Sequence, residues 1–294
     1  ESPETGNTSN LILDAFFKWN AFGNFEIWLG QTKLPGNRER VISSQQLQFV
    51  DRSLVNSRFN IDRDMGIQFH NKKRLGSVVT KQAFAISQGE GRNRTSGNYG
   101  GLEYTGRVEV LPFGEFTGKG DYFGSDLKRE ATPKLSIGVT YDYNDRAARE
   151  RGNLGGYVAD TAYSSLNTTF VDLMFKYNGL SVAAEYANKQ INGDRLVDAE
   201  DNFISNYYTG SGTAVQAGYL LPSNLEFAAR YTTIAPEKAS GRDLQDMYTI
   251  GVSKYIVGHY LKIQSDFSYL VETDQFTDEE AGEFIYRFQV ELAF

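Results

Sequence analysis

The sequence contains no cysteine and only two histidines, His70 and His259, in 294 residues. The absence of cysteine excludes a disulfide scaffold, a thiolate zinc site and a cysteine nucleophile. Two histidines do not favour a multi-histidine metal centre. We therefore expect neither a metal nor a cofactor.

Long apolar runs are also missing, since no stretch approaches the roughly 18 apolar residues that a transmembrane helix needs. The formal net charge of −7 does not indicate a nucleic-acid surface. The first residues, Glu1 to Thr5, show neither a basic nor an apolar region of a signal peptide. We therefore expect the natural chain to begin upstream of this sequence.

Aromatic residues and glycine are abundant, with 18 Tyr, 20 Phe and 29 Gly, whereas proline occurs only six times. Aromatic side chains favour strands, and glycine favours turns between them. The composition therefore predicts an all-β protein that is rich in turns.

The last twelve residues, EFIYRFQVELAF, alternate strictly between two kinds of side chain. One parity is apolar and the other is mostly polar, as expected for a strand with two different faces. An aromatic residue at the end of such a strand resembles the assembly signal of outer-membrane barrels. The inner strand of a soluble sandwich is the alternative interpretation of this segment.

The same alternation recurs along the chain, in segments of about ten residues that suit a tilted crossing of a bilayer. It predicts an antiparallel transmembrane β-barrel that forms a single domain over residues 1–294. The thirteen predicted strands are 11–20, 24–33, 64–71, 78–88, 100–112, 134–145, 167–178, 180–191, 212–222, 224–234, 245–257, 259–272 and 283–294.

The connectors between these strands alternate in length. They are short after odd-numbered strands and long after even-numbered ones, except for the long connector 113–133. Barrels of this kind have short periplasmic turns and long extracellular loops. We therefore expect the C-terminus on the periplasmic side, with tyrosines gathered near both rims. An odd number of strands cannot close such a barrel, so we expect either a short strand within 1–10 or further strands upstream.

Three motifs follow one another near the N-terminus: LGQTKLPGNRER at 29–40, QFVDRSL at 48–54 and RDMGIQ at 63–68. In order and spacing they resemble the phosphate-selective porin O and P family, and VLPFGE at 110–115 and GDY at 120–122 fit the same pattern. The resemblance implies an outer-membrane porin with sixteen strands in the complete protein. Three strands would then precede the thirteen predicted here.

The polar parity of the strands places charged side chains on the lumen wall. The predicted inward bases are Lys18, Arg107, Lys176, Lys189, Arg230, Lys262 and Arg287. The predicted inward acids are Asp14, Glu26, Asp64, Glu103, Glu109, Asp142, Asp172, Glu185, Glu226, Asp266 and Glu291. Because acids outnumber bases, the favoured interpretation is that these charges pair across neighbouring strands and stiffen the wall.

The remaining candidate for anion preference is the long extracellular loop 34–63, since a connector of this length is usually functional. Its anion-facing candidates are Arg38, Arg40, Arg52, Arg58 and Arg63. The resemblance implies that this loop folds into the lumen and narrows it. The alternative is that Arg52 pairs with Asp51 or with a wall carboxylate such as Glu103 and only pins the loop.

The predicted function is passive diffusion of small hydrophilic or anionic solutes, phosphate among them, through a porin. A non-conducting barrel that serves as a structural subunit of a larger outer-membrane or secretion complex is the alternative. An enzyme is disfavoured because neither histidine lies near a rim serine in the sequence. The expected partners are outer-membrane lipid, lipopolysaccharide, small anions and either a homotrimer or a larger complex, with no nucleic acid.

Overall fold

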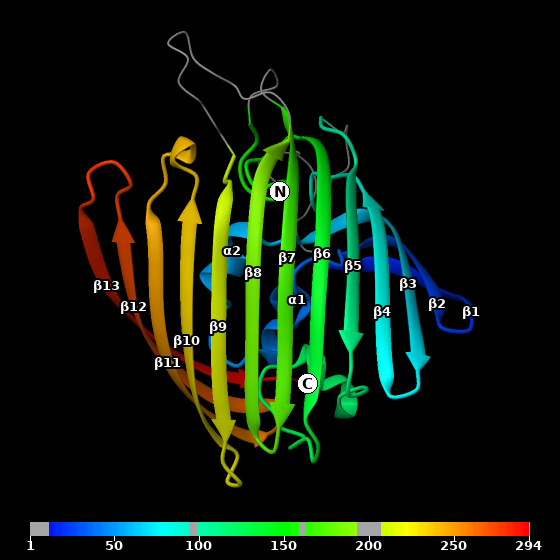
Figure 1. The fold of residues 1–294 in the computed structure, drawn as a ribbon, viewed down its shortest axis with the longest axis vertical. Helices are drawn as coiled ribbons and strands as arrows, with labels where there is room; N and C mark the ends of the chain where they lie inside the picture. Colours follow the sequence, from blue (N-terminus) through cyan, green and yellow to red (C-terminus); the bar gives the residue numbers. More distant parts are fainter. Residues whose placement is uncertain (1–11, 95–98, 159–162, 193–206, 294) are drawn as a thin grey trace.

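A computed structural model describes residues 12–94, 99–158, 163–192 and 207–293, which contain one sheet of thirteen antiparallel strands (Figure 1). Every strand pairs with its neighbours in the sequence, so the order in the sheet is the order in the chain. The strands are β1 (Ala15–Phe22), β2 (Phe25–Lys33), β3 (Arg63–Leu75), β4 (Val78–Ser87), β5 (Glu103–Leu111), β6 (Lys134–Ala147), β7 (Ser164–Tyr177), β8 (Leu180–Asn192), β9 (Gly210–Leu220), β10 (Leu225–Pro236), β11 (Leu244–Val257), β12 (Leu261–Thr273) and β13 (Glu280–Leu292).

The predicted all-β class and the thirteen antiparallel strands are confirmed, with ends that differ by a few residues. The largest differences are in β1, which begins at Ala15 rather than at 11, and in β3, which continues to Leu75 rather than 71 and leaves only Gly76 and Ser77 as its turn. Its last residues, KKRL, carry no alternation that would mark them as strand. Residue 11, at the start of the first predicted strand, and Phe294, at the end of the last one, lie outside the described residues.

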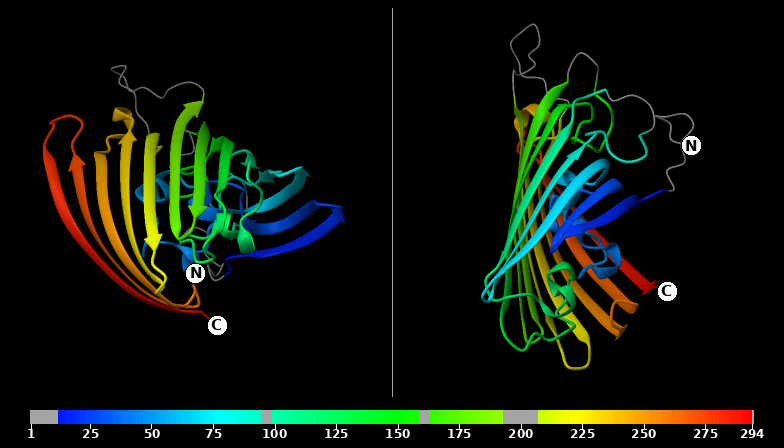
Figure 2. Two further views of the ribbon diagram at one scale, coloured as in Figure 1. Left: turned by 60° about the horizontal axis from the view of Figure 1, so that its bottom comes forward. Right: turned by 90° about the vertical axis from the view of Figure 1, so that its right-hand side faces the viewer.

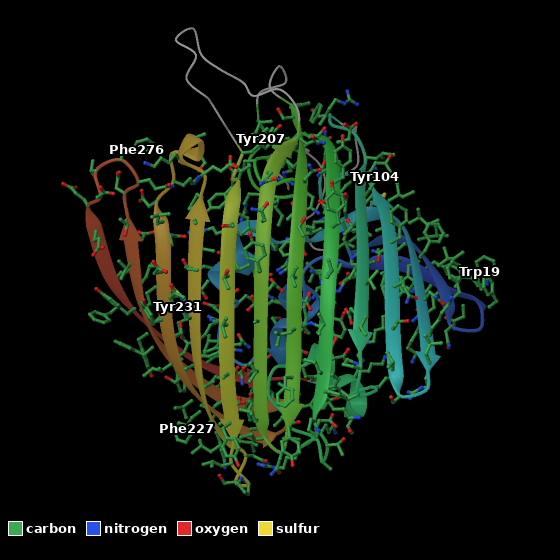
Figure 3. All side chains as sticks on the ribbon, viewed as in Figure 1. Trp19, Tyr104, Tyr207, Phe227, Tyr231 and Phe276 are labelled. Carbon is green, nitrogen blue, oxygen red and sulfur yellow. The ribbon has the colours of Figure 1, made fainter. Side chains whose placement is uncertain are left out.

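The two faces of the sheet have the reverse of a soluble protein's polarity. On β6 the apolar Ile137, Val139 and Tyr141 are 43%, 48% and 52% exposed, whereas Ser136, Thr140 and Asp142 of the other parity are buried. Figure 3 shows the same outward face on β10, where Phe227 and Tyr231 lie on one side of the strand. Burying one large apolar side chain is worth about 1.5–3 kcal/mol, so such a surface is stable against lipid rather than water.

The strand connectors are short at one end of the sheet and long at the other. Two-residue turns join β1 to β2, β3 to β4 and β7 to β8. In the last of these, Asn178 and Gly179 both have positive φ (47° and 91°), the backbone that a type I′ hairpin requires. The exception is again the connector between β5 and β6, which spans residues 112–133 and lies at the short-turn end.

The helices are all short and lie in the connectors: α1 (Arg38–Val41), η1 (Ser44–Gln46), α2 (Leu54–Phe59), η2 (Thr117–Tyr122) and η4 (Lys238–Ser240). Among the described residues, no helix is long and apolar enough to cross a lipid bilayer.

Two connectors lie on the concave side of the curved sheet, and we call them loop 34–62 and segment 112–133 (Figure 2). The apolar part of loop 34–62 forms the main buried cluster of the fold, in which Val55 and Phe59 of α2 pack with Phe170 and Ile234 of the wall. The two connectors also touch, because the backbone N–H of Gly124 donates to the carbonyl of Gln46 at 2.7 Å. A Cβ at Gly124 would lie 2.6 Å from the Gln48 nitrogen, so only glycine fits there.

Candidate functional site

The first arginine of loop 34–62, Arg38, is buried against the wall. Its Nε donates to Asp172 of β7 at 2.6 Å and its Nη2 donates to the Ser136 hydroxyl of β6 at 2.8 Å. Its Nη1 donates to the backbone carbonyl of Asp121 at 3.0 Å. Burial alone would lower the pKa of Arg38, but the carboxylates of Asp172 and Glu109 raise it above its ordinary value.

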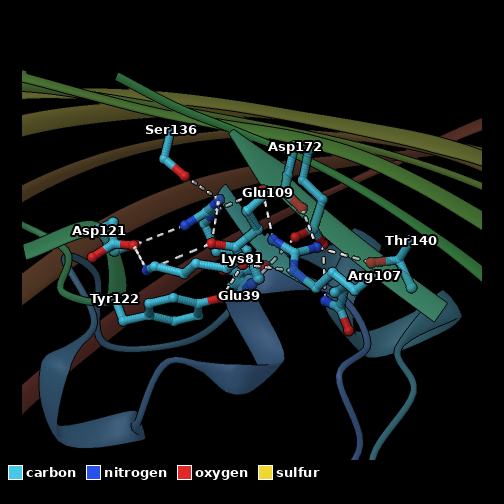
Figure 4. Close-up of polar contacts among 12 residues, drawn as sticks. Glu39, Lys81, Arg107, Glu109, Asp121, Tyr122, Ser136, Thr140 and Asp172 are labelled. Atoms are coloured by element: carbon cyan, nitrogen blue, oxygen red, sulfur yellow. Dashed lines mark hydrogen bonds and ion pairs between the residues drawn. The ribbon is translucent and has the colours of Figure 1, made fainter. Parts of the chain in front are cut away.

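Arg38 belongs to a set of charges of both signs that we call the wall ion cluster. Figure 4 labels its other members. Its bases and acids are Arg38, Lys81, Arg107, Glu109, Asp121 and Asp172. Arg107 of β5 reaches Asp172 with two hydrogen bonds of 2.6 and 3.0 Å and Glu109 with one of 2.7 Å. Lys81 of β4 pairs with Asp121. The cluster therefore joins three strands, β4, β5 and β7, to both inserted connectors.

The far half of loop 34–62 is held by the opposite side of the wall. Gln48 donates to Glu226 of β10 at 2.8 Å, and the backbone N–H of Val50 donates to Asp266 of β12 at 3.0 Å. Arg287 of β13 forms an ion pair of 2.6 Å with Asp51. Because β5 to β13 all supply contacts, this loop lies across the concave side rather than along one strand.

Four half-buried bases form a second group, the Lys33 cluster: Lys33, Arg40, Arg52 and Arg63. Arg40 pairs with Asp62 through a bond of 2.7 Å from its Nε, and Arg63 pairs with Asp14 at 2.9 Å. Burial would raise the pKa of Asp62, but its hydrogen bonds and charge pairing with Arg40 hold that pKa below its ordinary value.

Among the described residues, the other two members of the Lys33 cluster have no carboxylate partner within 4 Å. Lys33 donates to the carbonyl of Val41 at 3.0 Å, and Arg52 donates to the carbonyls of Glu39 at 3.0 Å and Ile42 at 2.7 Å. Arg52 thus bonds to backbone carbonyls of its own loop instead of forming the ion pair with Asp51 or Glu103 that was the alternative interpretation of the sequence. Burial and the neighbouring charge of Arg40 lower the pKa of Arg52. The structure thus holds two bases near each other without compensating acids within 4 Å.

A third group of bases surrounds the buried ring of Tyr208, and we call it the Tyr208 cluster. Arg58 and Arg242 lie 5.9 and 5.3 Å from the ring centroid, within cation–π range, and Arg151 donates to the carbonyl of Ser57. Burial lowers the pKa of Arg151, and the charges of Arg58, Arg149 and Arg242 act in the same direction against Glu150. Positive charge therefore gathers at the long-loop end of the sheet.

The predicted lumen-lining charges lie on the concave face, mostly buried beneath the inserted connectors. The buried ones are Arg107, Lys176, Lys189, Arg230, Lys262, Glu103, Glu109, Asp172, Glu185, Glu226 and Asp266, whereas Lys18, Arg287 and Glu291 near the sheet edges are partly exposed. Asp64 and Asp142 are also buried, and Glu26 and Asp14 are not.

Cross-strand pairing accounts for only part of these charges. Lys18–Glu26, Lys262–Glu291 and Asp266–Arg287 do pair between neighbouring strands, at 2.8, 3.3 and 3.6 Å. Others bind the inserted connectors instead, since Lys176 donates to the carbonyl of Ser125 and Glu185 accepts from Asn37. Arg230 donates to the carbonyl of Asp51, and Lys189 donates to the carbonyl of Arg151. The predicted pairing of wall charges between neighbouring strands therefore holds for only some of these residues.

Sequence reasoning missed Lys33, Lys81, Tyr122 and Gln48. The position of Lys81 was readable, because Phe84 and Ile86 mark the outward parity of β4 and leave Lys81 on the inner one. The Tyr122 hydroxyl bonds to Glu109, but nothing local marks segment 112–133 as inserted. Its contacts join residues far apart in the chain, which periodicity does not reveal.

The two histidines do not form a catalytic pair with a serine. His70 shares a hydrogen bond of 3.0 Å with Gln68, and His259 packs against the rings of Phe123 and Tyr255. Burial, with the nearby charges of Lys262 and Lys176, lowers the pKa of His259 to about 3. Its ring is therefore neutral at physiological pH.

Comparisons with known proteins agree with the sheet and its motifs. The family model described as phosphate-selective porin O and P matches residues 1–290. An uncharacterized protein of Aquifex aeolicus (strain VF5) is 26% identical over 266 residues, which cover 84% of this chain. The match spans 60% of the length of that relative.

Three solved structures that match this chain are each 12% identical to it. OmpT of Vibrio cholerae, in a trimer form, is matched over 90% of this chain and 78% of its own, with a TM-score of 0.47. An anion-selective porin from Comamonas acidovorans is matched over 91% and 73%, also at 0.47. OccAB1 of Acinetobacter baumannii is matched over 92% and 65%, at 0.46.

The family match covers nearly the whole chain, and it is a family of porins rather than of enzymes. Two of the family motifs flank the inserted loop. They are the 29–40 motif with its GQ, K and P positions and the 63–68 motif with its RD, G and Q positions. The chain is therefore a member of the phosphate-selective porin O and P family of the bacterial outer membrane.

Proposed function

We propose that this chain forms a porin channel in the outer membrane through which small hydrophilic solutes diffuse passively, with a preference for anions such as phosphate. The observation that carries the proposal is the Lys33 cluster on loop 34–62. Lys33 and Arg52 have no carboxylate within 4 Å among the described residues, so a passing anion can supply the missing negative charge.

The Tyr208 cluster also supports a preference for anions over cations. It lies at the long-loop end of the sheet, which is the extracellular end in the proposed orientation with the C-terminus in the periplasm. A basic entrance raises the local concentration of anions and speeds their capture. In this account the arginines have two roles. Arg38 anchors loop 34–62, whereas Arg40 and Arg52 of the loop and Arg63 of β3 face the solute.

The test replaces the two unpaired bases together, as Lys33→Gln with Arg52→Gln, and measures the reversal potential in a planar bilayer under a potassium chloride gradient. We expect the ratio of anion to cation permeability to fall roughly two- to tenfold, the effect of about 0.4–1.4 kcal/mol on anion passage. The matched control is Lys254→Gln, which removes one positive charge from the outward face. A double variant with the wild-type ratio would refute the assignment of this cluster.

A non-conducting barrel that serves as a structural subunit is the second candidate. The bond between Gly124 and Gln46 favours it, because this contact joins the two inserted connectors across the concave side. Folded protein that carries no current, and that is isolated with a stoichiometric partner, would support this candidate over the channel.

The exposed apolar face of the sheet is the proposed contact with membrane lipid and lipopolysaccharide. Assembly into a homotrimer stays a prediction from the family resemblance. Native mass spectrometry in detergent tests it, with a trimer as the expected species.

A further inference from the structure

Loop 34–62 and segment 112–133 enter the concave side from opposite ends of the sheet. Besides the Gly124–Gln46 bond and an apolar cluster that contains Ile42, Leu47 and Phe116, they share a buried polar contact point. That point is the guanidinium of Arg38, whose exposed fraction is 2%. Its three donors reach β6, β7 and the backbone of segment 112–133 at 2.8, 2.6 and 3.0 Å. A planar, fixed set of donors holds three acceptors in one geometry, which a lysine could not do.

The acceptor on β7, Asp172, holds a second arginine as well. Arg107 extends from β5 across β6 to reach it, and it can do so only because Gly138 lies between them. A Cβ at Gly138 would lie 2.5 Å from Nη2 of Arg107 and 2.7 Å from Oδ1 of Asp172. Both oxygens of Asp172 are therefore committed to the two arginines.

Segment 112–133 is fixed to the same cluster by side chains of its own. Asp121 pairs with Lys81, and the Tyr122 hydroxyl donates to Glu109, which also accepts from Arg107. The Tyr122 ring lies 5.2 Å from the guanidinium of Arg38 and 5.1 Å from the ammonium of Lys81. Charges in the wall ion cluster are thus compensated only when both connectors are in place.

We propose that the wall ion cluster is a shared anchor of the two inserted connectors, with Asp172 and Arg38 as the positioning residues, so that loss of the cluster releases both connectors together. Removing the Asp172 carboxylate leaves Arg38 and Arg107 buried with one carboxylate fewer. In Asp172→Asn the two arginines compete for the single oxygen that still accepts, and the bond that Arg38 donates to segment 112–133 loses its fixed geometry. The inference rests on the proposed channel function only for its electrical consequence, which is added flicker between open and closed levels.

The test is hydrogen–deuterium exchange of the full chain, comparing Asp172→Asn with the wild type. We expect exchange to rise roughly tenfold or more in both residues 38–42 and residues 117–124. The matched control is Glu185→Gln. Glu185 is also a buried wall carboxylate, and it accepts from Asn37 at 2.8 Å and from the N–H of Glu39 at 3.2 Å. Among the described residues it has no hydrogen bond or ion pair to segment 112–133.

Because Glu185→Gln leaves the wall ion cluster intact, a shared anchor predicts that this variant raises exchange in loop 34–62 and leaves residues 117–124 at the wild-type rate. The proposal is overturned if Asp172→Asn changes only one of the two connectors, or if Glu185→Gln loosens both equally. Should Asp172→Asn fail to fold, Arg38→Lys gives the same test, because it keeps the charge and loses the three-way contact. A wild-type protein without conductance would overturn the channel function but would leave the outcome of this exchange experiment intact.

Discussion

At the scale of single residues, the inner face of the wall depends on where side chains are absent as much as on where they are present. Gly138 on β6 lies in register between Glu109 of β5 and Asp172 of β7. Its missing side chain leaves the space that Arg107 crosses. Arg107 of β5 and Asp172 of β7 can therefore form an ion pair across β6. Rules for pairing between neighbouring strands do not predict such a contact.

Gly138→Ala is therefore expected to displace Arg107 or Asp172 and to lower stability by about 1–3 kcal/mol, the usual cost of overpacking. The measurement is the temperature at which the folded band is lost on semi-native gel electrophoresis. Gly106→Ala on the next strand is the control, since its Cβ would meet nothing closer than 4.0 Å. Equal melting of the two variants would contradict this account.

At the scale of elements, loop 34–62 is held by an apolar anchor as well as by charges. Phe59 of α2 is fully buried with Leu34, Val55, Phe170 and Ile234. The N-terminal end of α2 is capped by Ser53, whose side chain accepts from the N–H of Asn56. The loop therefore has a fixed position on the wall rather than a range of them.

Phe59→Ala is expected to cost about 3–5 kcal/mol, because the cavity cannot close against a rigid wall. That cost falls on the loop, so limited proteolysis of the folded protein should cut within 34–62 much faster than in the wild type. Phe113→Ala removes a ring that is 52% exposed and serves as the control. Protection equal to that of the wild type would show that the ring does not hold the loop.

The elements differ in how far the sequence predicts them. The strands could be predicted because period-two alternation is local and because lipid requires apolar side chains on every outward position, as on β6. The partners of the loop could not, since Arg38 meets Asp172 and Asp121 through contacts of 134 and 83 residues in sequence separation. Lys33 was overlooked because only the folded loop shows that it lacks an acid.

At the scale of the whole molecule, the sheet presents apolar side chains outward and charged ones inward, and two connectors occupy part of its concave side. The buried wall charges are largely compensated by those connectors or by each other, so they contribute little net field. What remains is the positive charge of the cluster members that have no carboxylate partner among the described residues, such as Lys33, Arg52 and Arg58. The predicted selectivity is therefore mild and arises from the loops rather than from the wall.

The most direct test of this account is the reversal potential of the wild-type protein in a planar bilayer with a potassium chloride gradient. The account predicts measurable single-channel current and a reversal potential displaced toward that of chloride. A reversal potential displaced toward that of potassium, or a folded protein that carries no current, would contradict it.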